Sequence, residues 1–221
     1  MRRSRRRSQL FCLDDPKSPV SESYKALRTN LQYIQMKEDA KVILVTSSLP
    51  EEGKSTTVSN LAVAFAQSGK SVLLVDCDLR KPNIHKIFGE SNEVGLTDIL
   101  MKRKELEEVV LETVQPNLFI LTSGMSQDSP AELLEMDEMK DFMMHVSSLY
   151  DLVIVDSPPL LPVTDGKILA KYADGVVLVI HAGKTLQEHV KKAKNQLDLI
   201  GANIYGAVLN QDKSKKLLYY Q

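Results

Sequence analysis

The chain has 221 residues, 43% of them hydrophobic and 26% charged, so it can bury the core of one α/β domain. Its net charge is −1, which gives the body of the protein no electrostatic reason to bind nucleic acid. Its two cysteines form no C-x-x-C pattern of a metal or redox site. No apolar run approaches the roughly 18 residues of a membrane-spanning helix, and none follows the N-terminal arginines as it would in a signal peptide. We therefore expect a protein of a reducing, cytoplasmic compartment without a structural disulfide.

The first 20 residues are basic and irregular. Five arginines stand among the first seven residues, Pro16 and Pro19 follow, and no helical or strand periodicity is sustained. This pattern predicts an extended arm over residues 1–20, either a solvated tail or a segment that lies on anionic lipid or an acidic partner.

At Ser21 the pattern changes to that of a helix over about residues 21–36. One face is apolar, with helical spacing of Tyr24, Leu27, Leu31 and Ile34. Another face repeats charge every third residue, at Glu22, Lys25 and Arg28. A helix that precedes the first strand is expected to pack outside the sheet, where such a stripe is usually solvated and less often a subunit contact.

The next stretch has the pattern of a phosphate-binding loop. The apolar run Val42-Ile43-Leu44-Val45 predicts a buried strand, and Gly53-Lys54-Ser55 then opens a helix. Backbone N–H groups and the positive end of a helix dipole suit a polyphosphate there, with Lys54 on the β- and γ-phosphates and Ser55 on magnesium. Ser48 stands where the usual G-x-x-x-x-G-K-[ST] pattern has its first glycine, so on this stretch alone an ordinary strand-turn-helix remains the alternative.

Carboxylates follow two further predicted strands. Residues 71–75 form an apolar run that ends in Asp76-Cys77-Asp78-Leu79-Arg80, and residues 152–155 form another that ends in Asp156. Ligands bind at the carboxyl edge of open parallel sheets, so we expect these acids to lie beside the phosphate loop. Acids at strand ends together with a lysine-bearing loop favour magnesium-nucleotide chemistry.

The rest of the chain alternates strands with helices. Strands are predicted over residues 117–121, 175–180 and 204–209, and helices over residues 131–147, 165–171 and 186–200. We therefore predict a single P-loop NTPase domain of the α/β class, with a mostly parallel sheet of about six strands flanked by helices.

Several motifs resemble those of the bacterial protein-tyrosine kinases of the capsule and exopolysaccharide type. The loop from Ser47 to Thr56 resembles the family's S-x-x-P-x-E-G-K-S-T, and the stretch after residue 75 resembles its second Walker motif. The further matches are Arg80-Lys81-Pro82-Asn83-Ile84-His85, Asp156-Ser157-Pro158-Pro159, Thr122-Ser123-Gly124, Pro130-Ala131-Glu132-Leu133-Leu134 and the charged stripe Glu22, Lys25 and Arg28, in which Lys25 replaces an arginine.

The resemblance implies an ATP-dependent protein-tyrosine kinase that uses Mg²⁺. Asp76 would accept the proton of the incoming phenol, with Lys54, Asp78 and Arg80 as the other catalytic residues. The metal would be held by Ser55, Asp78 and Asp156. The nucleotide would contact Ser48, Glu52, Gly53, Lys54, Ser55, Thr56 and Asn210, although Gln211 replaces the arginine that follows this asparagine in the family.

The basic arm over residues 1–20 is then followed, as the resemblance implies, by a kinase domain over residues 21–210 and a tyrosine tail over residues 211–221. Tyr219 and Tyr220 would be phosphorylated between subunits of a ring-type homo-oligomer joined by Glu22, Lys25 and Arg28. The expected partners are a transmembrane activator of the polysaccharide co-polymerase type, a cognate tyrosine phosphatase and protein substrates, but not nucleic acid. The protein would lie at the inner face of the cell membrane and regulate capsule or exopolysaccharide synthesis.

Two other functions compete with this one. A partitioning-type ATPase that binds a membrane or DNA partner would carry a lysine near the start of the phosphate loop, where this chain has Ser48-Leu49. An iron–sulfur scaffold of the same fold would need a C-x-x-C motif, which the sequence lacks.

Overall fold

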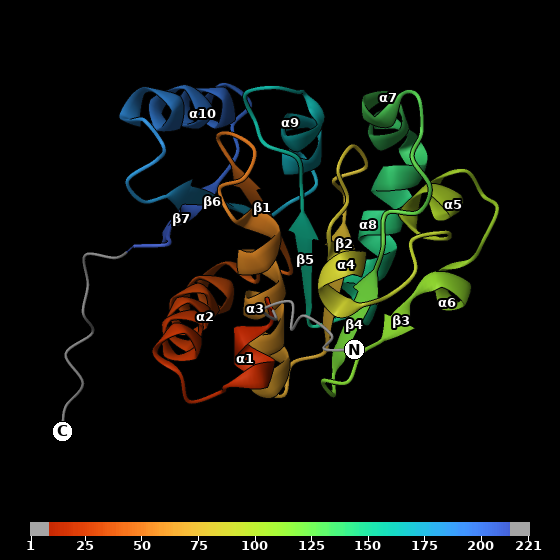
Figure 1. Cartoon of the computed structure of the whole chain (residues 1–221). Coiled ribbons are helices and arrows are strands. Elements are labelled where there is room, and N and C mark those ends of the chain that lie inside the picture. The colour runs from red at the N-terminus through yellow and green to blue at the C-terminus, as the bar shows by residue number, and fades with distance from the viewer. Residues whose placement is uncertain (1–8, 213–221) are drawn as a thin grey trace, which may run out of the picture.

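The computed structural model describes residues 9–212 (Figure 1). The arginines of residues 2–7 and the tail tyrosines Tyr219 and Tyr220 lie outside the described residues. No helix within the described part of the chain is long and apolar enough to cross a membrane.

The core is a seven-stranded sheet with the order β3-β4-β2-β5-β1-β6-β7. Every pair is parallel except β3 with β4, which confirms the predicted mostly parallel sheet. Sequence patterning missed β3 because a two-residue strand shows no periodicity. The strands are β1 (Val42–Ser47), β2 (Val72–Asp76), β3 (Leu111–Glu112), β4 (Leu118–Leu121), β5 (Leu152–Asp156), β6 (Gly175–His181) and β7 (Ile204–Asn210).

Helices cover both faces of the sheet (Figure 1). Successive residues of β1 alternate between two apolar clusters, Ile43 facing the cluster that contains α3 and Leu44 facing the cluster that contains α8, because a strand turns its side chains to opposite faces. The helices are α1 (Phe11–Asp14), α2 (Pro19–Glu38), α3 (Lys54–Gln67), α4 (Ile84–Phe88), α5 (Leu96–Leu100), α6 (Leu106–Val109), α7 (Pro130–Glu135), α8 (Asp137–Leu149), α9 (Asp165–Ala170) and α10 (Gln187–Leu199).

Two helix predictions need correction. The helix expected over residues 131–147 is interrupted at Met136, whose backbone is extended (φ −64°, ψ 152°). Asp137 and Glu138 begin a new helix there, and acidic side chains in a first turn interact favourably with the helix dipole. The helix expected from residue 21 begins at Pro19, with Ser18 as its N-cap, because proline suits the first helical position.

The segment from Gln9 to Ser18 is not the extended arm that the sequence predicted. It forms α1, and Cys12 is fully buried against α3. Asn60 and Gln67 of α3 hold its backbone, since Cys12 N–H donates to Asn60 Oδ1 (3.0 Å) and Gln67 Nε2 donates to the Cys12 carbonyl (3.0 Å). A four-residue helix is too short to show periodicity, which is why the prediction was wrong here.

Candidate active site

The carboxyl ends of β1, β2 and β5 meet at one edge of the sheet, as the sequence predicted (Figure 1). A pocket of about 710 Å³ opens at this edge. Three segments line it: the phosphate loop between β1 and α3, the loop after β2, and the proline-rich loop after β5. The predicted site residues in its wall are Gly53, Lys54, Ser55, Thr56, Asp78 and Arg80.

The backbone of the phosphate loop takes two left-handed conformations. Glu51 has φ 64°, which is uncommon for a residue with a side chain, and Gly53 has φ 88°. A Cβ on Gly53 would collide with the side-chain amide of Asn210, and the left-handed backbone would be strained with any side chain, so glycine is favoured at this position. Lys54 then begins α3, which places the positive end of that helix at the pocket.

Ser48 and Glu52 do not line the pocket, although the sequence suggested that they contact nucleotide. Both residues are buried. Glu52 Oε2 accepts hydrogen bonds from the N–H groups of Ser48 (2.8 Å) and Leu49 (3.2 Å). Their role in this structure is to close the loop on itself, with Ser48 in the place of the usual glycine.

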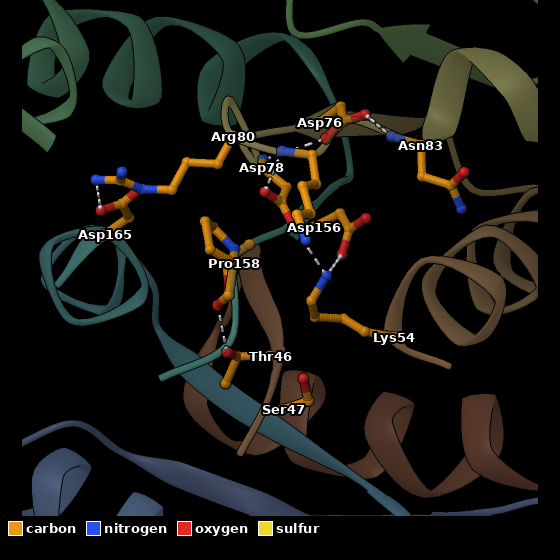
Figure 2. Close-up of polar contacts among 12 residues, drawn as sticks. Thr46, Ser47, Lys54, Asp76, Asp78, Arg80, Asn83, Asp156, Pro158 and Asp165 are labelled. Carbon is orange, nitrogen blue, oxygen red and sulfur yellow. Dashed lines mark hydrogen bonds and ion pairs between the residues drawn. The ribbon is translucent and has the colours of Figure 1, made fainter. Parts of the chain in front are cut away.

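Lys54 lies between two carboxylates, as Figure 2 shows. Its Nζ is 3.2 Å from Asp156 Oδ1 and 3.4 Å from Asp78 Oδ2. Burial acts to lower the pKa of Lys54, but the charges of Asp156 and Asp78 outweigh it and raise the pKa above its ordinary value. The lysine is therefore a fixed positive charge at the pocket.

Asp156 and Asp78 suit a magnesium site. Burial raises the pKa of Asp156, against the opposing effects of the Lys54 charge and the Ser55 hydroxyl. Oδ2 of Asp156 is buried and has no hydrogen-bond partner in the described structure. Magnesium usually takes one or two carboxylates and completes its shell with phosphate and water, so this donor set fits the ion.

Asp76 does not line the pocket, although the resemblance implies that it accepts the proton of an incoming phenol. It is fully buried, and its oxygens accept N–H groups of Asp78 (3.1 Å), Asn83 (3.0 Å) and Ile84 (3.0 Å) (Figure 2). Burial, with the charge of Asp156 adding to it, raises the pKa of Asp76 to about 7. In this conformation Asp76 shapes the loop after β2, and Asp78 is the carboxylate exposed to the pocket.

Arg80 is paired with Asp165, the first residue of α9 (Figure 2). Nε of Arg80 donates to Oδ2 (2.7 Å) and Nη2 donates to Oδ1 (3.0 Å) of this fully buried carboxylate. The guanidinium thus joins the loop after β2 to α9 while lining the pocket. Asp165 was not predicted as a site residue, because nothing near it in the chain points to a partner 85 residues earlier.

Two further predicted nucleotide contacts have partners within the chain. Thr56 lines the pocket, and its hydroxyl donates to Gln9 Oε1 (3.0 Å), so the N-terminal segment reaches the start of α3. Asn210 ends β7 and donates from Nδ2 to the carbonyl of Glu52 (2.9 Å). It supports the phosphate loop rather than lining the pocket.

The charged stripe of α2 is only partly open. Lys25 pairs with Glu22 on the same helix (2.7 Å), and Arg28 Nη1 donates to the carbonyl of Ala64 on α3 (3.2 Å). Arg28 therefore contributes to packing within the chain, and its availability for another subunit is less than the sequence suggested. Tyr219 and Tyr220 lie outside the described residues.

Comparison with known proteins is consistent with this geometry. Residues 40–207 match the family model of an AAA domain. The chain is 44% identical over 215 residues to the tyrosine-protein kinase YwqD of Bacillus subtilis, covering 97% of this chain and 91% of the relative. It is 35% identical to the putative tyrosine-protein kinase CapB of Staphylococcus aureus, covering 96% and 95% of the two chains.

Solved structures of other proteins share the fold of this chain. The kinase domain of the Escherichia coli tyrosine kinase ETK superposes with a TM-score of 0.90 at 32% identity, covering 100% of this chain and 88% of that one. The septum site-determining protein MinD of Pyrococcus horikoshii, complexed with Mg-ADP, shares the fold at 23% identity with a TM-score of 0.68, covering 80% and 72%. The P-loop fold implies nucleotide binding, and identity favours the kinases over the partitioning-type ATPase. The chain belongs to the family of bacterial tyrosine-protein kinases.

Proposed function

We propose that this kinase transfers the γ-phosphate of ATP, bound with Mg²⁺, to tyrosines in the C-terminal tail of a neighbouring subunit. The observation that carries the proposal is the arrangement of Lys54 between Asp78 and Asp156 beside the N-terminus of α3. This arrangement combines a phosphate-binding cation with metal-binding acids at one edge of the sheet.

The ion pairs of Lys54 suggest how ATP and the metal would enter together. A triphosphate on the N-terminus of α3 would attract the Lys54 ammonium away from the acids, and the two carboxylates would then need another positive charge. Mg²⁺ would supply that charge and neutralise the phosphate oxygens when bound. Ser55, Asp78 and Asp156 would hold it, while Gly53, Lys54, Ser55 and Thr56 contact the phosphates.

The proton of the phenol needs an acceptor, because a phenol with a pKa near 10 is a weak nucleophile at neutral pH. We propose the carboxylate pair Asp76 and Asp78. A pKa of about 7 suits Asp76 as a base, provided that the loop after β2 releases its N–H groups on substrate binding. Arg80, which keeps one face toward the pocket, would add positive charge near the transferring group.

The tail is the proposed substrate. Residues 211–221 follow β7 and can span about 36 to 40 Å when extended, which is enough to reach the site of an adjacent subunit. The tail lysines Lys213, Lys215 and Lys216 would favour approach to a cleft loaded with nucleotide.

The remaining parts of the proposal concern assembly. The stripe of Glu22, Lys25 and Arg28 would join subunits in a ring, the arginines of residues 2–7 would face an anionic membrane surface, and a transmembrane activator would hold the protein at the inner face of the cell membrane. A tyrosine phosphatase would reverse the reaction, and phosphorylation would regulate capsule or exopolysaccharide synthesis. The chimerical protein CapA2B2 superposes with a TM-score of 0.89 at 35% identity, covering 92% of this chain and 90% of that one. Similarity to this protein and to CapB supports the proposed role in capsule synthesis.

A mixing experiment tests transfer between subunits. The double variant Tyr219→Phe, Tyr220→Phe keeps its catalytic site but has no tail acceptor, and Lys54→Met keeps its tail but loses the phosphate-binding charge. With ATP and Mg²⁺, each protein alone should give little tail phosphotyrosine by mass spectrometry, and the mixture should phosphorylate the tail of Lys54→Met. Full phosphorylation of the doubly substituted protein, or no transfer in the mixture, would contradict the trans-acting tail.

A further inference from the structure

The connection between β6 and α10 contacts the phosphate loop at Glu52, a residue that does not line the pocket. The hydroxyl of Thr185, in that connection, donates to Glu52 Oε1. The two residues are 133 positions apart in sequence. The same hydroxyl accepts the N–H of His181, the last residue of β6 (3.1 Å), so Thr185 is itself fixed to the sheet.

Glu52 divides its two carboxylate oxygens between the loop and Thr185. Oε2 accepts both N–H groups at the start of the loop, those of Ser48 and Leu49. Oε1 is left for Thr185. Because Glu52 is 3% exposed, water cannot readily replace a lost partner, and Thr185 is the residue that holds the second oxygen of this carboxylate.

The backbone of Glu52 is held from the same side. Asn210 donates to its carbonyl, and the Ala182 N–H donates to the carbonyl of Asn210 (2.9 Å). The phosphate loop is thus attached at Glu52 to β7 and to the β6–α10 connection. The adjoining residues Glu51 and Gly53 have the left-handed conformations that define the loop, so a change at Glu52 would alter them.

We propose that Thr185 is a positioning residue for nucleotide binding. It orients Glu52, and through Glu52 it fixes the backbone N–H groups of the phosphate loop before ATP arrives. Preorganised donors contribute to affinity because the loop need not be ordered when the ligand binds. Thr185 does not line the pocket, so its effect falls on binding and not on the chemical step.

Three variants separate this role from general stabilisation. Thr185→Val removes the hydroxyl at nearly constant shape, whereas Thr185→Ser keeps it. Thr113→Val is the matched control, because Thr113 is also half-buried. Its hydroxyl also donates one hydrogen bond (to the Gln115 carbonyl, 3.1 Å) and accepts one (from the Gln115 N–H, 3.1 Å). Thr113 lies beside β3, the outer strand on the side of the sheet away from β6 and β7.

The measurements are the dissociation constant for a fluorescent ATP analogue, KM for ATP, kcat at saturating ATP and the melting temperature. We expect Thr185→Val to raise the dissociation constant and KM about tenfold, the loss of one hydrogen bond to a charged group, with kcat within about twofold of wild type. Thr185→Ser should bind ATP as the wild type does. Thr113→Val should lower the melting temperature without changing ATP affinity.

A second comparison holds even where Thr185→Val is less stable. In a Glu52→Gln background, Thr185→Val should weaken ATP binding much less than in the wild type, because the hydroxyl acts through the carboxylate. Equal losses in the two backgrounds, unchanged affinity of Thr185→Val, or a Thr185→Ser protein as weak as Thr185→Val would overturn the proposal. The inference rests on ATP as the proposed nucleotide. A wild-type protein that does not bind ATP contradicts the proposed function. If the wild type binds ATP and Thr185→Val binds it equally well, only the role of Thr185 is contradicted.

Discussion

Nζ of Lys54 lies 3.2 Å from Oδ1 of Asp156, which joins the first residue of α3 to the last residue of β5. Both side chains are buried, and the second acid, Asp78, is 3.4 Å from the same ammonium. This contact makes the positive charge of the phosphate loop and the negative charges of the proposed metal ligands interdependent. A change to one of the three residues therefore alters the environment of the other two.

Lys54→Met should abolish ATP binding and phosphotransfer, because it removes the charged group that we propose as the main contact to the β- and γ-phosphates. It also leaves Asp156 and Asp78 without their cation, so the melting temperature should fall. Binding is measured by titration with a fluorescent ATP analogue, and stability by calorimetry. Lys192→Met, at an exposed position of α10, is the control and should change neither quantity. Unchanged phosphotyrosine in Lys54→Met would exclude this loop as the phosphate site.

Asp76→Asn should still bind Mg²⁺-ATP, because Asp78 and Asp156 are the proposed metal ligands. Phosphotransfer should fall by roughly 10²- to 10⁴-fold, the usual contribution of a general base. Single-turnover rates and equilibrium binding distinguish the two effects. Weak ATP binding with an unaltered rate at saturation would instead assign Asp76 to holding the loop after β2, as its three N–H contacts in this structure allow.

The pH dependence of stability reports on the same carboxyl group. Asp76 has a pKa of about 7 in the folded protein, against an ordinary value of 3.8, so between about pH 4 and pH 7 the folded state binds more protons than the unfolded state. The contribution of Asp76 to the free energy of unfolding is therefore present below pH 4 and lost as the pH rises to 7. Denaturant unfolding at pH 4.5, 6 and 7.5 should show the wild type losing stability relative to Asp76→Asn. A difference that is independent of pH would mean that the carboxyl is not perturbed.

Arg80→Ala should destabilise the protein by about 1 to 3 kcal/mol, because the buried Asp165 loses its bidentate partner. Solvent at the half-exposed Arg80 side chain screens the pair and keeps the expected loss below that of a fully buried one. Lys81→Ala is the control, since Lys81 is exposed and its side chain forms no ion pair within residues 9–212. Adding Asp165→Asn to Arg80→Ala should recover part of the loss in denaturant unfolding. Equal stability of Arg80→Ala and Lys81→Ala would show that the pair contributes little.

Arg28→Glu should convert the proposed oligomer to monomers in light scattering. Arg28 also donates to Ala64 in its own chain, so Lys25→Glu provides an independent test with less effect on the packing of α2 on α3. Lys37→Glu, exposed in the last turn of α2, controls for the change in net charge. If both Arg28→Glu and Lys25→Glu keep the assembly state of the wild type, the stripe is a solvated face.

Much of the site could be predicted from sequence because its parts are local. Gly53-Lys54-Ser55 must follow a strand and begin a helix, and Asp78 and Asp156 follow apolar runs that end at the same edge of any parallel sheet. Strand and helix periodicities indicated the α/β class for the same reason, since each depends only on neighbours in the chain.

Only the tertiary structure decided which side chains pair across long separations. Asp165 meets Arg80, and Thr185 meets Glu52, because the order of the strands brings distant loops together at one edge. The burial of Asp76 and the docking of residues 9–14 on α3 depend in the same way on contacts between distant segments. Hydrogen-bond and charge interactions act over a few ångströms in space whatever the distance along the chain, so their partners follow from the fold and not from the local pattern.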